Sequence, residues 1–119
     1  MKEKRKTKRR YLLYYVRIYD AATRQQIGNL VDITPHGFML VSEHPFPEGK
    51  TTRLRMELTS EVAEKPFLEF SAISRWSKPD VTPNMFNTGF EILGLLPEDG
   101  EIILRIIEEF GFRDNTPVK

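Results

Sequence analysis

Apolar and polar residues alternate with a period of two along most of this 119-residue chain. The alternation is clearest around Leu54, Met56 and Leu58, which are separated by charged residues, and it recurs from Phe67 to Trp76. Successive side chains of a strand point to opposite faces, so this pattern is typical of half-buried strands. It predicts six strands, at about residues 15–19, 26–33, 38–41, 53–58, 67–76 and 85–93.

Residues that favour turns separate these segments. Within Thr34-Pro35-His36-Gly37, the proline fixes φ at the second position, and the glycine is expected to adopt the left-handed conformation. Residues 78–84 contain two prolines and are therefore predicted to form a loop. Gly89 lies inside a predicted strand, where a glycine either weakens pairing or admits a close approach to the backbone.

One segment near the C-terminus has a helical period instead. Its apolar stripe consists of Ile102, Ile103, Ile106, Ile107 and Phe110. Pro97 suits the first helical position, and Gly111 suits the position just after the last turn. We predict a mainly β domain over residues 11–113, a small six-stranded antiparallel barrel with one C-terminal amphipathic helix at about 98–110, followed by a tail at 114–119.

The composition limits the classes of protein to consider. A chain of this length is typical of a single domain with one core. It has no cysteine and two histidines, which excludes disulfides and cysteine chemistry and argues against a metal site. No apolar run approaches the roughly 20 residues of a transmembrane helix, and no signal-peptide core follows the basic N-terminus. We therefore expect a soluble cytoplasmic protein without membrane insertion.

Basic residues are concentrated in the first ten positions. Seven lysines and arginines stand there against one glutamate, a net charge of +6, whereas the remaining 109 residues carry −5. The overall net charge of +1 hides this separation. We interpret residues 1–10 as a flexible basic arm beside a mildly acidic body, an arrangement suited to an anionic ligand.

Two groups of residues can bind such a ligand. Arg5 and Arg9 are four positions apart, and each guanidinium can grip a phosphate or a guanine edge bidentately. Asp32 can accept hydrogen bonds from guanine N–H groups, while Thr34 and Gly37 offer a hydroxyl and an open backbone for a phosphate. Each group also fits a plainer interpretation, namely a solvated terminus and a turn whose polar side chains cap their own backbone.

Taken together, the two groups resemble the motifs of the PilZ family, bacterial receptors for the second messenger cyclic di-GMP. That family carries an R-x-x-x-R motif near its N-terminus and a [D/N]-x-S-x-x-G motif on its barrel. Arg5 and Arg9 fit the first motif, and Asp32, Thr34 and Gly37 fit the second. Residues 87–91 further resemble the strand that closes PilZ barrels, so the resemblance extends from residue 5 to about residue 110.

The resemblance implies roles for these residues. Arg5 and Arg9 would clamp guanine edges and phosphates, with Arg10 assisting, and the arm would become ordered when the ligand binds. From the barrel side, Asp32 would accept from a guanine, while the 34–37 turn would line the phosphate path. Thr34 stands where the family has serine, which keeps the hydroxyl but adds a methyl group and stiffens χ1.

Three further residues lie near these motifs. His36 lies inside the turn and is a secondary candidate for contact with a phosphate. Trp76 ends a predicted strand and is a secondary candidate for stacking on a guanine, although packing in the core or at the rim explains it equally well. We expect Arg75 on the opposite strand face from Trp76, as a solvated charge.

These features predict a non-catalytic receptor that binds cyclic di-GMP, uses no cofactor and signals to a partner protein. One alternative is a PilZ-like interaction adaptor without a nucleotide, which would be expected to lack the arginines or Asp32. Another is a small barrel that binds RNA or DNA, although its strands show no surface row of aromatic residues flanked by lysine and arginine. No P-loop, HExxH or GxSxG motif indicates an enzyme.

Overall fold

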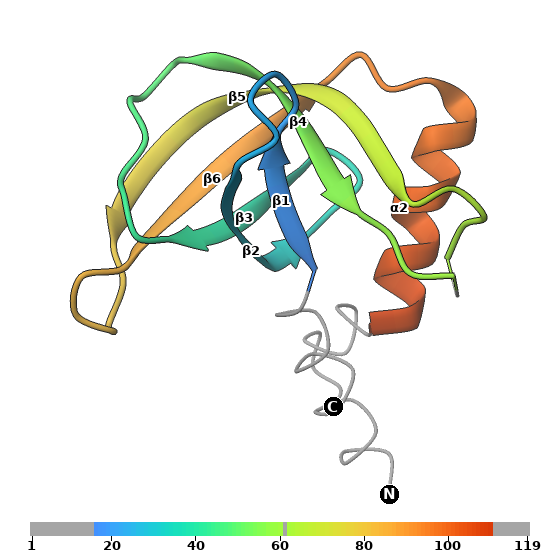
Figure 1. Cartoon of the computed structure of the whole chain (residues 1–119). Coiled ribbons are helices and arrows are strands. Elements are labelled where there is room, and N and C mark those ends of the chain that lie inside the picture. Colours follow the sequence, from blue (N-terminus) through green and yellow to red (C-terminus); the bar gives the residue numbers. More distant parts are fainter. Residues whose placement is uncertain (1–15, 61, 111–119) are drawn as a thin grey trace, which may run out of the picture.

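Six antiparallel strands close into a barrel in the computed structural model, which describes residues 16–60 and 62–110 (Figure 1). The strands are hydrogen-bonded in the order β1-β2-β3-β6-β5-β4, and β1 closes the barrel by pairing with both β2 and β4. The elements are β1 (Arg17–Asp20), β2 (Gln26–Ile33), β3 (Gly37–Ser42), β4 (Thr51–Glu57), β5 (Phe67–Pro79), β6 (Phe86–Leu93) and the helix α2 (Pro97–Phe110).

The predicted fold class is confirmed, because the described residues form a six-stranded antiparallel barrel followed by one C-terminal helix. One strand boundary is wrong: β5 continues to Pro79, into the segment predicted to be a loop. The proline is tolerated because it occupies the last position of the strand, opposite Phe86. The backbone hydrogen bond that closes the turn is donated by Asp80 to the Met85 carbonyl, at 2.8 Å. The expected start of the first strand at residue 15 lies outside the described residues.

The core is formed by the inward-facing side chains of the strands together with the inner stripe of α2. Phe38 stacks on Phe90 with ring centroids 5.2 Å apart, and Phe70 meets Phe38 edge-on. Burying each aliphatic side chain stabilises the fold by about 1.5–3 kcal/mol. The most deeply buried aliphatic residues are Ile18, Leu30, Ile33, Leu40, Leu54, Met56, Leu68, Ile103 and Ile106.

The helix α2 covers one end of the barrel, while the β5–β6 hairpin extends away at the other end (Figure 1). Glu98 and Asp99 lie in its first turn, where negative charge is favoured by the helix dipole. Asp99 also pairs with Lys65 at 3.0 Å, and Arg105 donates from Nη1 to the Val62 carbonyl at 2.6 Å. Both contacts tie α2 to the connection between β4 and β5.

Two β-bulges interrupt the strict alternation of inward and outward residues. The register shifts in β2 at Val31, so that Val31 and Asp32 both point away from the core. The same happens in β5 at Arg75, where Arg75 and Trp76 are both exposed. A bulge adds one residue to one strand and thereby reverses the face of every residue beyond it. Asp32 and Trp76 therefore lie on the outer face of the barrel.

The β5–β6 hairpin is held at its tip by one carboxylate. Asp80 accepts from the Thr82 amide through Oδ2 at 3.0 Å and from the Asn87 side chain through Oδ1 at 2.7 Å. Asn84 supplies the left-handed conformation of the turn, with φ of 67°. These contacts fix the hairpin that carries Trp76 at its base.

Acidification tests this account of the hairpin. The pKa of Asp80 is held below its ordinary value first by the Thr82 amide and then by the Asn87 side chain, because both donate to the ionised carboxylate. The stability that these two hydrogen bonds give the folded state is complete above the ordinary pKa of about 4. It is lost as the pH falls through the lower pKa of Asp80 in the folded state. We expect an NMR titration to give Asp80 a midpoint below that of an unstructured peptide, with the Thr82 amide signal moving alongside. A midpoint at the ordinary value would contradict the role given to this carboxylate.

Candidate functional site

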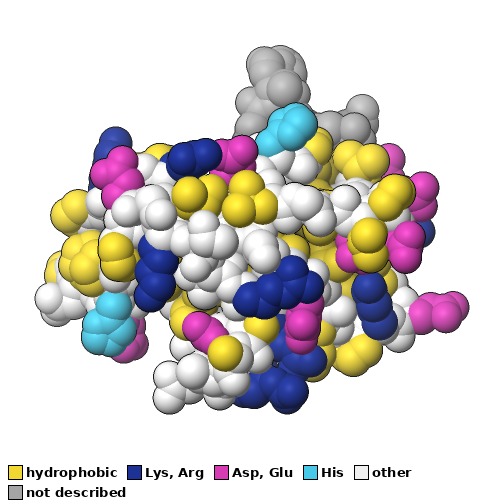
Figure 2. All heavy atoms as spheres, turned by 90° about the horizontal axis from the view of Figure 1, so that it is seen from above, with side chains coloured by type: hydrophobic (Ala, Val, Ile, Leu, Met, Phe, Trp, Pro, Cys, Tyr) yellow, Lys and Arg dark blue, Asp and Glu magenta, His cyan; other side chains and the backbone are white. Residues whose placement is uncertain are grey.

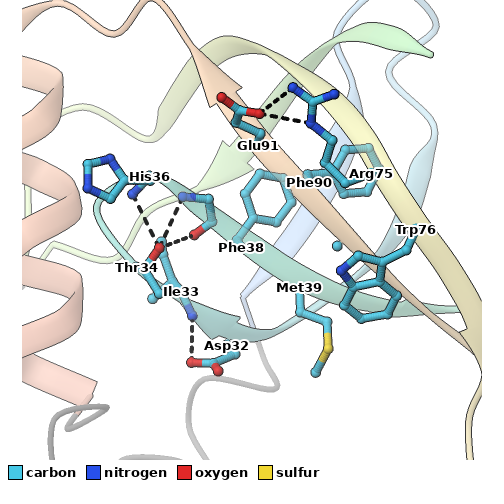
Figure 3. A pocket seen from close by; sticks show the side chains of 12 residues that line it. Asp32, Ile33, Thr34, His36, Phe38, Met39, Arg75, Trp76, Phe90 and Glu91 are labelled. Carbon is cyan, nitrogen blue, oxygen red and sulfur yellow. Dashed lines mark hydrogen bonds and ion pairs between the residues drawn. The ribbon is translucent and has the colours of Figure 1, made fainter. Parts of the chain in front are cut away.

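A pocket of about 380 Å³ lies on the outer face of the barrel, over β2, β3, β6 and β5 (Figure 3). One row of its lining follows strand pairing: Asp32 pairs with Met39, Met39 with Gly89, and Gly89 with Trp76. Since neighbouring strands lie about 4.8 Å apart, this row crosses four strands in roughly 14 Å. The lining is completed by Ile33, Thr34, His36, Gly37, Phe38, Arg75, Phe90 and Glu91.

The turn between β2 and β3 is organised by the Thr34 hydroxyl. It accepts from the His36 amide at 3.2 Å and from the Gly37 amide at 3.1 Å, and it donates to the Gly37 carbonyl at 3.3 Å. A hydroxyl has one donor and two acceptor positions, so all three are used within the turn. The long donated bond is the one that a phosphate oxygen can most easily replace. The turn-capping interpretation of this motif is therefore realised by Thr34, and ligand contact remains a prediction.

Asp32 lies near the end of β2 and His36 lies within the turn, and both line the pocket. The Asp32 carboxylate is half-buried and accepts from the Ile33 amide through Oδ1 at 2.8 Å. Within the described part of the chain, its Oδ2 has no hydrogen-bond donor and can accept from a ligand. His36 is exposed, and its carbonyl accepts from the Ile92 amide at 2.9 Å, which fixes the backbone of the turn to β6.

The two glycines of the lining are required by close contacts within the protein. A Cβ atom on Gly37 would lie 2.3 Å from the Phe90 carbonyl oxygen, and one on Gly89 would lie 2.4 Å from the Trp76 ring. Gly37 does not have positive φ, so the expected left-handed conformation is wrong, and the tight approach of β6 explains the glycine instead. At Gly89 the expected approach to the backbone is confirmed, and the approaching group is the indole of Trp76.

Trp76 and Arg75 lie on the same face, contrary to the sequence-based expectation. The bulge at Arg75 turns Trp76 out of the core, and its ring lies beside Gly89 with 37% of the residue exposed. The Lys78 ammonium lies 5.5 Å from the ring centroid. Arg75 is not merely a solvated charge, because it lines the pocket and forms an ion pair with Glu91 across the strands (Figure 3).

The arginines of the predicted clamp, Arg5, Arg9 and Arg10, lie outside the described residues. The first described residues, Val16 and Arg17, lie beside β2. Arg17 pairs with Asn29, and the Leu30 amide donates to the Val16 carbonyl at 2.9 Å. Because the pairing is antiparallel, Val16 lies beside Leu30, two residues before Asp32 along β2.

Neither a metal centre nor a membrane-spanning helix is found in the described ranges, 16–60 and 62–110. No three histidine, aspartate or glutamate side chains there come together as metal ligands, and α2 is too short and too polar to cross a bilayer. The pocket instead combines an indole, a guanidinium and two carboxylates around an apolar strand surface. Such a lining suits an organic ligand with flat rings and polar edges.

Sequence reasoning did not identify Met39 and Glu91 as parts of this site. Met39 stands in an apolar run that predicts a buried strand, and nothing in that run indicates which of its residues point outward. Glu91 stands two residues after Gly89, and residues two apart in a strand point to the same face. The sequence could therefore have placed Glu91 on the same outer face as Gly89. The contact of Glu91 with Arg75 depends on how β5 and β6 are aligned at the bulge, which neither segment indicates alone.

No family model and no curated protein matches the sequence. Solved structures do match it in fold. The motility inhibitor MotI/DgrA of Bacillus subtilis is 19% identical with a TM-score of 0.62, over 87% of this chain and 48% of that one. The PilZ domain of YcgR from Escherichia coli, solved with c-di-GMP, is 17% identical with a TM-score of 0.61, over 85% and 84%. PlzA from Borreliella burgdorferi, solved in complex with c-di-GMP, is 12% identical with a TM-score of 0.53, over 95% and 51%.

These structures establish that the fold is PilZ-like. The fold implied by the PilZ resemblance is therefore confirmed, independently of the motifs that suggested it. The chain spans about half the length of the Bacillus and Borreliella proteins and most of the Escherichia coli domain. At 12–19% identity, the likeness concerns the architecture of the barrel and its helix alone.

Proposed function

We propose that this PilZ-like barrel is a non-catalytic cytoplasmic receptor for cyclic di-GMP in bacteria. The arm would wrap the ligand, with Arg5 and Arg9 binding guanine edges and phosphates and Arg10 assisting. From the barrel, Asp32 would accept from a guanine and the 34–37 turn would receive a phosphate. Binding would order the arm, and the resulting surface would be recognised by a partner protein.

One observation carries this proposal: the outer-face pocket gathers the second motif and Trp76 on one surface of the barrel. Asp32 and Trp76 are 44 positions apart in the sequence, yet they occupy one row across four strands. The row offers a free carboxylate oxygen at one end and an indole at the other. A guanine needs both an acceptor for its N–H groups and a flat surface for its ring. Solved complexes of the Escherichia coli and Borreliella proteins with c-di-GMP support the same ligand class.

The charge of the pocket supports a role for the arm. Among the described lining residues, Asp32 and Glu91 are acidic and Arg75 is basic, so the pocket by itself carries a net negative charge. A ligand with two phosphates therefore needs cations from elsewhere. The arm supplies a net charge of +6, and it precedes β1, the strand that pairs with β2.

Trp76 is the single tryptophan of the chain, so its fluorescence reports on this pocket alone. We expect cyclic di-GMP to change the Trp76 emission in a saturable way at micromolar concentration, and calorimetry to give the same dissociation constant. Stacking on a base brings the indole out of water and alters its emission.

Two controls give this titration its meaning. GMP presents one guanine and one phosphate, so we expect it to compete only weakly, because it cannot bridge the arm and the barrel. A Trp76→Phe variant should keep most of the heat of binding while losing the optical signal. No heat and no fluorescence change at several hundred micromolar cyclic di-GMP would refute the receptor proposal.

Partner signalling has some support at the far tip of the β5–β6 hairpin. Val81 is 98% exposed there, and the hairpin is continuous with the strands that hold Trp76 and Gly89. We propose this tip as the surface that a partner protein contacts. An adaptor that does not bind nucleotide would use the same tip, and the titration described above separates the two functions.

The nucleic-acid alternative receives less support from the barrel surface. Seen from above, the molecule presents lysine and arginine side chains interspersed with aspartate and glutamate (Figure 2). This face has no continuous basic stripe of the kind that follows a nucleic-acid backbone. Binding to RNA or DNA through the arm would be recognised by steep loss with salt and no preference for the cyclic dinucleotide.

A further inference from the structure

The Arg75–Glu91 ion pair forms one wall of the pocket, and its geometry allows a ligand group to replace either partner. Nε and Nη2 of Arg75 lie 2.8 and 2.5 Å from the same carboxylate oxygen, Oε1 of Glu91. The two side chains are 55% and 46% exposed. An ion pair this exposed contributes little to stability, so a stronger partner for either group can displace the other.

The Arg75 guanidinium has N–H donors that its contact with Glu91 does not use. Its five N–H donors serve a single oxygen atom among the residues that the structure describes, whereas a fork of two donors on two oxygens is the stronger arrangement. A phosphate group presents two such oxygens side by side. Arg75 is therefore better matched to a phosphate than to the one oxygen of Glu91 that it contacts.

The position of the pair in the barrel favours this exchange. Arg75 is the extra residue of the β5 bulge, next to Trp76, and Glu91 pairs with Gly37 at the start of β3. The two charges thus border the pocket beside the row from Asp32 to Trp76, on the side where β3 begins. Arg75 is also the one cation among the described lining residues, whereas Glu91 would repel a phosphate held beside it.

We infer that Arg75 and Glu91 form an exchangeable clasp, in which Arg75 leaves Glu91 and binds a phosphate of the bound cyclic dinucleotide. Glu91 competes with the ligand for Arg75 and thereby sets the affinity of the receptor. The inference rests on the proposed function and adds to it a third kind of contact, supplied by the barrel and not by either sequence motif.

The clasp makes two variants act in opposite directions. Removing the cation with Arg75→Ala should weaken binding of cyclic di-GMP about tenfold or more, because a charge-assisted contact is lost. Removing only the negative charge with Glu91→Gln should tighten binding about three- to tenfold, because Arg75 is released and repulsion is reduced. A pair that merely stabilises the two strands would give both variants the same small effect.

The barrel contains a matched control pair. Arg55 and Glu69 form a cross-strand ion pair at 2.8 Å between β4 and β5, away from the pocket lining. Arg55→Ala and Glu69→Gln change the net charge by the same amounts as the clasp variants. We expect both to leave the dissociation constant within about twofold of the native protein, since exposed pairs outside the site act only through screened, long-range charge.

The measurement is calorimetry of the native chain and the four variants with cyclic di-GMP at one salt concentration, with thermal melting to verify folding. The clasp is supported if Arg75→Ala weakens binding and Glu91→Gln tightens it, while both control variants keep the native dissociation constant. If the native chain binds cyclic di-GMP but Glu91→Gln binds it more weakly or equally well, the clasp is wrong and the receptor function stands. Equal tightening by Glu69→Gln also overturns it, because net charge alone would then explain the gain. Absence of native binding refutes both.

Discussion

Replacing Arg9 with alanine should weaken binding of cyclic di-GMP by at least thirtyfold. The pocket of the barrel is net negative, so the phosphates depend on the arm for charge neutralisation. A bidentate guanidinium contact that becomes enclosed by ligand and protein is worth about 2–5 kcal/mol when one partner is removed, and about 2 kcal/mol corresponds to thirtyfold. Calorimetry on the native and variant chains measures this loss directly.

Two further variants separate the contact from the charge. Arg9→Lys keeps the positive charge but not the planar fork, and we expect it to recover only part of the affinity. Arg53→Ala removes the same charge from β4, where Arg53 donates to Ser71 at 3.3 Å outside the pocket, and should leave binding nearly unchanged. If Arg9→Ala and Arg53→Ala weakened binding equally, the arm would act by general electrostatic attraction and the clamp would be wrong.

Gly37→Ala should destabilise the barrel more than any other substitution in the second motif. The added Cβ would meet the Phe90 carbonyl oxygen at 2.3 Å, and this atom belongs to the backbone of the paired strand β6. A backbone neighbour cannot rotate away, so β3 and β6 must separate locally. We expect a loss of about 3 kcal/mol in the free energy of unfolding, and a melting temperature lower by roughly 10–20 °C.

Gly100→Ala is the matched control for this change. Gly100 lies in α2, and a Cβ there meets no atom within 4 Å. Alanine is favoured over glycine inside a helix, so this variant should raise the free energy of unfolding by about 0.5–1 kcal/mol. A Gly37→Ala protein that melts like the native protein, but fails to bind the ligand, would show that the glycine serves ligand approach and not strand packing.

The strands and the helix could be predicted because their signals are local and repeated. Leu54, Met56 and Leu58 alternate cleanly, and the isoleucines of α2 fall on one stripe, so each element identifies its own buried face. Asp32, Thr34 and Gly37 could also be singled out from their spacing, and all three line one pocket of the structure. The spacing left two uses of the Thr34 hydroxyl open, ligand contact and turn capping, and the structure shows it bonded within the turn.

The rest of the pocket depends on two bulges that leave no clear trace in the sequence. Strict alternation from Phe70 places Trp76 in the core and Arg75 outside, whereas the extra residue brings both to the outer face. A bulge is decided by the fit between two strands, which is a property of the pair and not of either segment. For the same reason, the approach of Arg75 to Glu91 could not be read from either strand alone.

The four-residue strand β1 is the seam of the barrel, because it alone joins β2 to β4 on that side. The arm that is proposed to hold the ligand precedes this strand in the sequence. An arm that a bound ligand holds beside β2 would therefore keep β1 from separating from its neighbouring strands. With the ligand bound, β1 would separate from its neighbours less often, and its amide hydrogens would exchange more slowly with solvent. A partner could sense the messenger through the seam without touching the messenger itself.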